Sequence, residues 1–406
     1  MKLKKLCIFA TKVECNSRSV QFKYNKMITR LLDSEIRRLA NLFPVVIVNG
    51  PRQSGKTTLC KMAFEQFEYI NLENIATRGM VASDPLNYLK QHSSGLVIDE
   101  AQRLPELFSY IQVLVDEDKS RRYILTGSSN FALLGNVGQS LAGRAAILTL
   151  LPFAIEEMPN AMEQTTNTLM LKGGYPAVWC NGQSPQDVYS NYYTTYVERD
   201  LLQLVNIHNL SQFQQFVRLS AGRVSCEFNA SDFANELGCD LKTIQHWNSI
   251  LETSYITFML PPYYRNIGKR IIKTPKRYFY DTGLICFLLG IENEQQLETH
   301  PLRGAIFENM VVAEMVKRKY HHGRRPNFYF YRDKSQKEVD LIEEEAFEQL
   351  RAYEIKSAQS FHPQFTKGLE YFHGLYGEKV ISTTVLYDGN EALTTDYNGY
   401  RNYRSL

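Results

Sequence analysis

Residues 50–58 read Gly-Pro-Arg-Gln-Ser-Gly-Lys-Thr-Thr, which is a complete phosphate-binding loop. An apolar run at 45–48 comes directly before this loop, and a helix-like stretch at 59–64 follows it. Strand, loop and helix in this order form the setting in which the motif binds a nucleotide. The chain is therefore constrained to contain a parallel α/β unit with an anion site at a helix N-terminus.

The spacing within the loop assigns a role to each of its key residues. Gly50 and Gly55 allow the backbone to curl so that successive amides point at phosphate oxygens. We expect Lys56 to reach the β- and γ-phosphates of ATP and the Thr57 hydroxyl to ligate Mg²⁺. The predicted nucleotide-binding residues are Gly50, Pro51, Arg52, Gln53, Ser54, Gly55, Lys56, Thr57, Thr58 and Asp99. The alternative, a glycine turn that binds nothing, is disfavoured by the flanking strand and helix.

Length and composition limit the remaining possibilities. A chain of 406 residues with 44% apolar residues predicts about three domains with proper cores. The net charge of +3 does not by itself indicate a nucleic-acid binder, so charge has to be considered locally. Seven scattered cysteines without a CxxC pair argue against a disulfide framework and favour a reducing cytoplasm. No apolar run approaches the roughly 18 residues of a membrane span.

Apolar strand-like runs alternate with helix-like runs from residue 45 to 150, which is typical of a parallel α/β sheet. The third run ends in Asp99-Glu100, at the strand end where ligands bind in such sheets. We expect Asp99 to hold Mg²⁺ and Glu100 to orient and deprotonate the attacking water. Carboxylates at strand ends are more often helix caps, but the intact loop favours the catalytic interpretation. The five predicted strands are 45–49, 68–72, 95–99, 122–126 and 145–150.

The fourth predicted strand ends in a polar segment. Ser128 is the first candidate for contact with the γ-phosphate or the catalytic water, and Ser129 and Asn130 are close alternatives. An ordinary turn followed by an N-cap explains the same residues equally well.

Residues 151–224 are helix-like and rich in aromatic residues, and we interpret them as a helical lid. The stripe Tyr192, Tyr193 and Tyr196 is predicted to be core packing and not a base-stacking platform.

Residues 225–285 have the pattern of a winged helix-turn-helix, with helices at 232–237 and 241–251 and a strand at 255–260. The following stretch, 261–280, contains no acidic residue, and aromatic residues alternate with its cations. This pattern predicts a wing that binds the phosphates of duplex DNA; the alternative is a module that docks a protein. Its cations are Arg265, Lys269, Arg270, Lys273, Lys276 and Arg277.

The last 120 residues predict an αβββαβ order: helix 303–320, strands 327–332, 338–342 and 350–356, helix 364–375 and strand 380–387. This order resembles the core of PD-(D/E)xK nucleases, and the matching residues are Glu308, Asp340, Glu354 and Lys356. Period-two alternation places Glu354 and Lys356 on one strand face. Two carboxylates there could bind Mg²⁺ or Mn²⁺ while Lys356 steadies a hydroxide. Exposed strand charges on a nuclease-like fold that does not cleave are the alternative.

The order of motifs also resembles AAA+ ATPases, in which an arginine just before the fifth strand acts as a finger. The resemblance implies this role for Arg144, often toward a neighbouring subunit of a homo-oligomer; the alternative is a surface arginine at a helix C-terminus, which the helix dipole favours. From about residue 27 to 387 the chain resembles a bacterial and archaeal family that joins an AAA-type ATPase domain to a C-terminal DUF4143 domain. The phrases that carry this resemblance are Gly50-Pro51-Arg52-Gln53, Ser140-Leu141-Ala142-Gly143-Arg144, Gly173-Gly174-Tyr175-Pro176, Glu198-Arg199-Asp200-Leu201, Tyr278-Phe279-Tyr280-Asp281-Thr282-Gly283-Leu284, Gly304-Ala305-Ile306-Phe307-Glu308-Asn309 and Glu354-Ile355-Lys356-Ser357.

The expected architecture is thus an α/β P-loop NTPase with a five-stranded AAA+-like sheet, followed by the lid, the winged helix and the nuclease-like domain. The expected boundaries are 1–26 (an extension), 27–150, 151–224, 225–285 and 286–406. Two functions remain open: an ATP-hydrolysing machine that acts on DNA, or a slow ATP-dependent switch that docks a protein.

Overall fold

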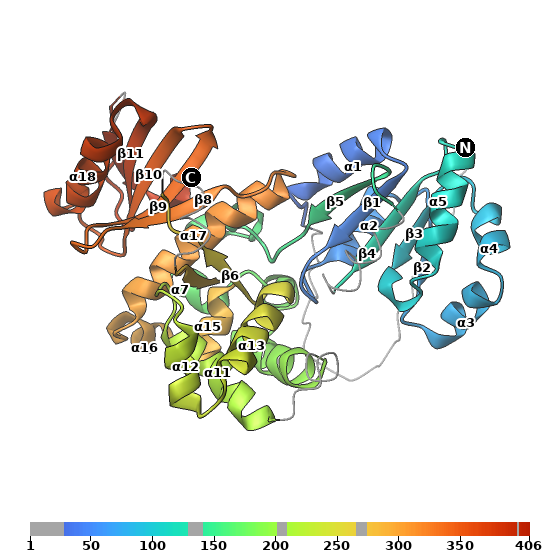
Figure 1. The fold of residues 1–406 in the computed structure, drawn as a ribbon, viewed down its shortest axis with the longest axis horizontal. Coiled ribbons are helices and arrows are strands. Elements are labelled where there is room, and N and C mark those ends of the chain that lie inside the picture. The colour runs from blue at the N-terminus through green and yellow to red at the C-terminus, as the bar shows by residue number, and fades with distance from the viewer. Residues whose placement is uncertain (1–27, 129–140, 201–208, 265–273, 396–397) are drawn as a thin grey trace, which may run out of the picture.

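The computed structural model describes residues 28–128, 141–200, 209–264, 274–395 and 398–406. Figure 1 shows a first sheet with its helices (blue to cyan), a mostly helical centre (green to yellow) and a second sheet (orange to red). The long helix α17 (Arg303–His321) runs between the second sheet and the first. Ser129 and Asn130, the alternatives to Ser128, lie outside the described residues. The same holds for four of the cations predicted to bind DNA: Arg265, Lys269, Arg270 and Lys273.

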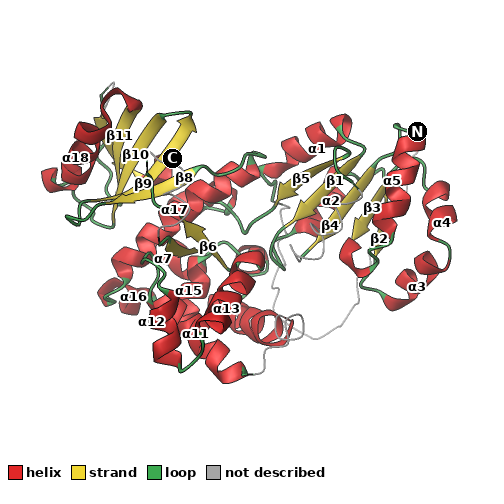
Figure 2. Cartoon of the chain, in the orientation of Figure 1, coloured by secondary structure: helices red, strands yellow, loops and turns green. Residues whose placement is uncertain are grey.

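The first sheet is parallel, with strand order β2-β3-β4-β1-β5. Its strands agree with the predicted ones to within one residue at each end. They are β1 (Val45–Asn49), β2 (Glu68–Asn71), β3 (Leu96–Asp99), β4 (Tyr123–Gly127) and β5 (Ala145–Thr149). Strand β1, which lies between β4 and β5, is buried along its whole length, because helices cover both faces of the sheet (Figure 2).

Alternate residues of β1 face two separate cores. Val46 and Val48 pack with α1 (Leu32–Leu42) and α2 (Lys56–Ala63). Val45 and Ile47 pack against the opposite layer, formed by α3 (Ile75–Ser83), α4 (Pro85–Gln91) and α5 (Leu107–Glu117). The two cores fix β1, and therefore the loop that leaves its carboxyl end.

The centre of the molecule is helical and shares one core that extends from Leu151 to Tyr403. Tyr192, Tyr193 and Tyr196 are buried in it, which confirms that this stripe is core packing. Its helices are α7 (Thr166–Lys172), α8 (Pro176–Cys180), α9 (Pro185–Tyr192), a π-helical stretch (Tyr193–Asp200), α11 (Leu210–Gly222), α12 (Ala230–Leu237), α13 (Leu241–Thr253), α15 (Thr282–Leu288) and α16 (Glu294–Thr299). The antiparallel strands β6 (Thr257–Leu260) and β7 (Lys276–Phe279) follow α13; β6 lies within the predicted strand 255–260, and β7 was not predicted.

The C-terminal part has the predicted αβββαβ order. After α17 come β8 (Phe328–Arg332), β9 (Glu338–Ala346), β10 (Gln349–Lys356), α18 (Lys367–Tyr376) and β11 (Val380–Tyr387). Two further strands, β12 (Leu393–Thr394) and β13 (Asn398–Asn402), were not predicted; they extend the mixed sheet to the order β12-β13-β11-β10-β9-β8. Short 3-10 helices span Ala101–Arg103, Ile155–Glu157, Ala161–Glu163, Pro363–Thr366, Gly377–Lys379 and Tyr403–Ser405.

Within the described ranges, no helix is long and apolar enough to cross a membrane. The cysteines of these ranges, Cys60, Cys180, Cys226, Cys239 and Cys286, are all free thiols, as the scattered spacing predicted.

Candidate nucleotide-binding site

The loop that follows β1 requires glycine at two positions. Gly50 has φ +142°, and a Cβ atom there would lie 2.1 Å from the carbonyl oxygen of Leu150. Gly55 has φ +93° and stands at the N-cap of α2, where a left-handed backbone favours glycine. The loop therefore ends with the free amides of a helix N-terminus facing outward, which is a site for anions.

Lys56 is held inside the curled loop. Its side chain is buried, and Nζ donates to the carbonyl oxygens of Gly50 (3.0 Å) and Pro51 (2.7 Å). Burial lowers the pKa of Lys56 to about 8, against the opposing charges of Glu100 and Asp99. The ammonium group thus lies where phosphate oxygens would replace the two carbonyls.

Asp99 is fixed by hydroxyl donors from three neighbouring elements. Oδ2 accepts from Thr57 Oγ1 (2.9 Å) and from the Tyr69 hydroxyl (2.7 Å), and Oδ1 accepts from Thr126 Oγ1. These three hydrogen bonds hold the Asp99 carboxylate in one orientation. Burial and the contact with Asp99 raise the pKa of Tyr69, so Tyr69 stays a donor.

Tyr69 and Thr126 were missed by the sequence reasoning. Pairing the predicted third and fourth strands in parallel could have indicated Thr126. In the observed register Ile98 pairs with Leu125, which places Asp99 beside Thr126. Tyr69 carries no comparable signal, since a tyrosine within a predicted strand suggests packing alone.

Glu100 lies at the carboxyl end of β3 with a left-handed backbone, φ +55°. Its Oε2 accepts from the Ser128 hydroxyl (3.1 Å) and from the side-chain amide of Gln102. Ser128 thus comes together with Glu100, from the end of the adjacent strand β4.

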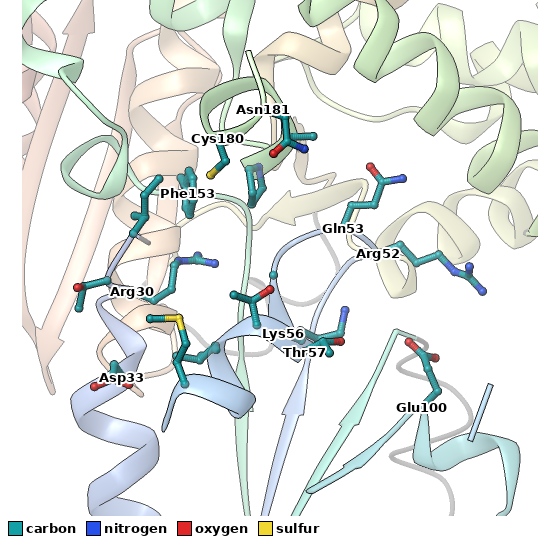
Figure 3. Close-up of a pocket in the computed structure, with 18 of the residues that line it drawn as sticks. Arg30, Asp33, Arg52, Gln53, Lys56, Thr57, Glu100, Phe153, Cys180 and Asn181 are labelled. Carbon is teal, nitrogen blue, oxygen red and sulfur yellow. The ribbon is translucent and has the colours of Figure 1, made fainter. Parts of the chain in front are cut away.

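A cavity of about 1110 Å³ opens above the loop. Arg52, Gln53, Lys56, Thr57 and Glu100 line one side of it (Figure 3). Phe153, Cys180 and Asn181 lie on the opposite side in the same view. The remaining lining residues include Gly55 and Thr58 of the loop and an apolar group made of Ile28, Leu59, Met62, Pro176 and Ala177. The cavity therefore offers polar groups for phosphates next to an apolar wall for a base.

Arg144 lies away from this cavity. It immediately precedes β5, which runs parallel to β1, so it lies at the amino end of the strands while the loop follows their carboxyl end, about 17 Å away along five strand residues. Its guanidinium forms a two-point ion pair with Asp116 of α5, at 2.6 and 2.7 Å. Arg144 is thus not placed to act on the nucleotide of its own chain.

Two of the cations assigned to a DNA-binding wing are buried, which corrects the prediction for them. Lys276 pairs with Glu308 (Nζ–Oε1 3.3 Å) and with Glu338. Arg277 donates to Ser220 and Asn248 (2.7 Å) among aromatic rings. The stretch 261–280 contains no acidic residue of its own, but Lys276 pairs with acids of α17 and β9, which come later in the sequence.

The nuclease-like residues do converge. Lys356 Nζ lies 2.6 Å from Glu354 Oε1 and 3.5 Å from Asp340 Oδ2. Burial and the charge of Asp340 raise the pKa of Glu354 to about 8. Glu308 accepts from the Tyr278 hydroxyl (2.6 Å) and faces Lys276. Nevertheless, no group of three or more His, Cys, Asp or Glu side chains suited to a metal ion occurs within the described ranges.

Comparison with known proteins agrees with this geometry. A family model for an AAA domain matches residues 42–159, a model for a domain of unknown function (DUF8612) matches 163–295, and one for a domain of unknown function (DUF4143) matches 303–403. The DUF8612 match spans the predicted boundary at 224, and the division of the centre into lid and winged helix stays a prediction.

Two curated relatives are the uncharacterized proteins Rv2008c of Mycobacterium tuberculosis and Mb2031c of Mycobacterium bovis. Each is 32% identical over 319 residues, which is 77% of this chain and 70% of the relative. Among solved structures, the Walker-type ATPase paby2304 of Pyrococcus abyssi is similar at 13% identity, covering 63% of this chain and 94% of its own, with a TM-score of 0.44.

The first part of the chain is an AAA-type ATPase domain, defined by its parallel sheet, its phosphate-binding loop and the family match. The chain as a whole belongs to the family of proteins that combine such a domain with a C-terminal DUF4143 domain.

Proposed function

We propose that the protein binds ATP together with Mg²⁺ and hydrolyses it in the cavity above the phosphate-binding loop. The observation that carries the proposal is the contact between Thr57 Oγ1 and Asp99 Oδ2 (2.9 Å), beside the buried ammonium group of Lys56. A hydroxyl and a carboxylate side by side, next to a cation, are the groups that a metal–triphosphate requires.

Each residue has a separate task in this proposal. Lys56 and the amides of the loop bind the β- and γ-phosphates, and Thr57 and Asp99 hold Mg²⁺. When bound, Mg²⁺ neutralises charge on the phosphates. Glu100 takes the proton of the attacking water, and Ser128 orients the Glu100 carboxylate through their hydrogen bond.

Arg144 acts in a neighbouring subunit in this proposal. Because it lies at the amino end of the strands, away from the loop, the nucleotide that it can reach is that of a second copy of the chain, so the active form is a homo-oligomer. The Asp116 ion pair holds the guanidinium until such a neighbour binds.

Steady-state ATP hydrolysis, measured with and without duplex DNA, tests the proposal. We expect Mg²⁺-dependent turnover by the parent protein and no nucleotide binding by Lys56→Ala, because this variant lacks the cation that meets the phosphates. Calorimetric binding of ATP at parent affinity by Lys56→Ala would refute the assignment.

The second candidate is a switch that binds ATP and turns over slowly. Two donors, from Ser128 and Gln102, already hold the Glu100 carboxylate, and this favours a resting form that does not activate water. Tight ATP binding with negligible turnover at every protein concentration would support the switch.

Duplex DNA is the proposed partner of the α12–α13 unit. The exposed side chains of α13 include Lys242, Gln245, His246 and Ser249, which are polar groups able to face base edges and phosphates.

At the C-terminal site, Asp340 and Glu354 would hold Mg²⁺ or Mn²⁺ for a metal-dependent nuclease, with Lys356 steadying the hydroxide and Glu308 facing them.

A further inference from the structure

Arg30, just ahead of α1, is a buried arginine that belongs to none of the sequence motifs. Its side chain is 6% exposed, yet it contacts three separate segments of the chain. Nη1 donates to the carbonyl oxygen of Ser54 (2.7 Å), Nη2 donates to that of Leu151 (2.8 Å), and Nε pairs with Glu157 Oε1 (2.8 Å).

The contact with Ser54 fixes the direction of a loop amide. Because a trans peptide points its C=O and N–H in opposite directions, holding the Ser54 carbonyl toward Arg30 turns the Gly55 N–H away from Arg30. Gly55 lines the cavity and stands at the N-cap of α2. Arg30 lines the same cavity, and rotation of this peptide would turn both the Ser54 carbonyl and the Gly55 N–H from the directions that Arg30 now fixes.

Glu157 holds Arg30 in the orientation that this contact needs. Its Oε2 lies 3.2 Å from Arg30 Nη2, which makes the pair two-pronged. The carboxylate also accepts from the backbone N–H groups of Leu31 and Ala154, both at 2.8 Å. Burial alone would raise the pKa of Glu157, but the contacts with His321 and Arg30 outweigh it and hold this pKa well below its usual value. Glu157 thus stays charged, and it fixes Arg30.

The C-terminal end of α17 completes the network. The Leu151 N–H donates to His321 Nε2 (3.2 Å), so Nδ1 carries the proton of the neutral ring, and Nδ1 lies 3.1 Å from Glu157 Oε2. His321 is fully buried, and burial lowers its pKa, which keeps the ring neutral.

We propose that Arg30 is a positioning residue for phosphate binding, which acts by fixing the peptide between Ser54 and Gly55 and is itself oriented by Glu157 and His321. The proposal rests on the proposed function, because it concerns the same nucleotide site. It adds that ATP affinity depends on a helix, α17, that lies outside the ATPase domain.

The test compares Arg30→Lys with Arg122→Lys. Arg122 is a matched control: it also donates to backbone carbonyls, among them Ala40 of α1 (2.8 Å), but it lies just before β4, at the amino end of the strands and away from the loop. The measurements are the calorimetric Kd for Mg²⁺–ATP and the ATP-induced shift of the Gly55 amide-proton signal in ¹⁵N-glycine-labelled full-length protein.

We expect Arg30→Lys to weaken ATP binding by about tenfold, the cost of one charge-assisted hydrogen bond, and to lose most of the Gly55 shift. Arg122→Lys should bind ATP and shift the Gly55 signal like the parent. Glu157→Gln keeps Arg30 but loses its charged partner, and we expect a smaller change in the same direction. This second variant also tests the network if Arg30→Lys fails to fold.

Three outcomes would overturn the proposal. Parent affinity in both Arg30→Lys and Glu157→Gln would overturn it while leaving the proposed ATP binding intact. Weaker binding with an unchanged Gly55 shift would assign Arg30 a general structural role. A parent protein that binds no ATP would overturn this inference and the proposed function together.

Discussion

The Ser128 hydroxyl donates a hydrogen bond to Glu100 Oε2 across 3.1 Å and so joins the carboxyl ends of β4 and β3. The side-chain amide of Gln102 donates to the same oxygen. The carboxylate proposed as the general base is therefore oriented by its own chain before any substrate binds.

The first prediction concerns this base. Glu100→Gln should bind ATP at parent affinity and lose turnover by about 10²–10⁴-fold, because an amide cannot accept the proton of water. Ser128→Ala, which keeps the base but removes a donor, should lower kcat less. Both are measured as kcat alongside calorimetric Kd. Parent turnover by Glu100→Gln would place the base elsewhere.

The second prediction concerns Arg144. Arg144→Ala should slow hydrolysis at unchanged ATP affinity, since its guanidinium is expected to meet the phosphates only across a subunit interface. Mixing it with Glu100→Gln protein should restore part of the activity, because one type of mixed interface keeps both groups. A monomer by light scattering whose specific activity is independent of protein concentration would contradict this. Asp116→Asn, which removes only the resting ion-pair partner, is the control and should remain active.

The sequence predicted elements well and long-range contacts poorly. All strands of the first sheet follow from apolar runs, and the loop follows from a motif in a contiguous stretch. The local sequence wrongly predicted that Lys276 and Arg277 are exposed cations of a wing. They are buried, because their partners lie on α17, β9, α11 and α13. The sequence also gave no indication of the role of Arg30. Two of its acceptors are backbone carbonyls, of Ser54 and Leu151, and a backbone acceptor requires no particular residue type.

The third prediction is a pH dependence of stability. Burial raises the pKa of Glu314 to about 7, while its carboxylate accepts from the Ile155 N–H. Since the folded pKa lies above the unfolded one, the stability from this group is complete below about pH 4.5 and is lost as pH rises to about 7. The loss is on the order of 3 kcal/mol. Glu314→Gln should flatten the unfolding free energy over this window, measured by urea titration at several pH values. An unchanged slope would refute the assignment.

The fourth prediction concerns duplex DNA. Replacing Lys269, Arg270 and Lys273 together should weaken binding and lower the salt slope by up to about three units, roughly one per lost phosphate contact. Fluorescence anisotropy at several salt concentrations measures both quantities. Replacing Lys334 and Lys337, which are exposed in the turn between β8 and β9, is the control and should change neither. If the triple variant behaves like the parent, the α12–α13 unit is better explained as a protein-docking module.

The last prediction concerns the C-terminal site. Lys356 contacts both Glu354 and Asp340, so three of the residues proposed for the nuclease-like site lie together, while Glu308 pairs with Lys276. We expect Lys56→Ala protein, in which ATP chemistry is silenced, to cut linear or branched DNA with Mg²⁺ or Mn²⁺. Adding Asp340→Asn should abolish the cutting, because a ligand carboxylate is lost.

Glu343→Gln is the matched control for this site, because Glu343 lies on the same strand but pairs with Lys319. This variant should cut DNA like its parent. Cutting that survives Asp340→Asn would come from another site or from a contaminant. If a pure preparation cuts no DNA with either metal, the domain keeps a nuclease-like arrangement of charged residues without the activity.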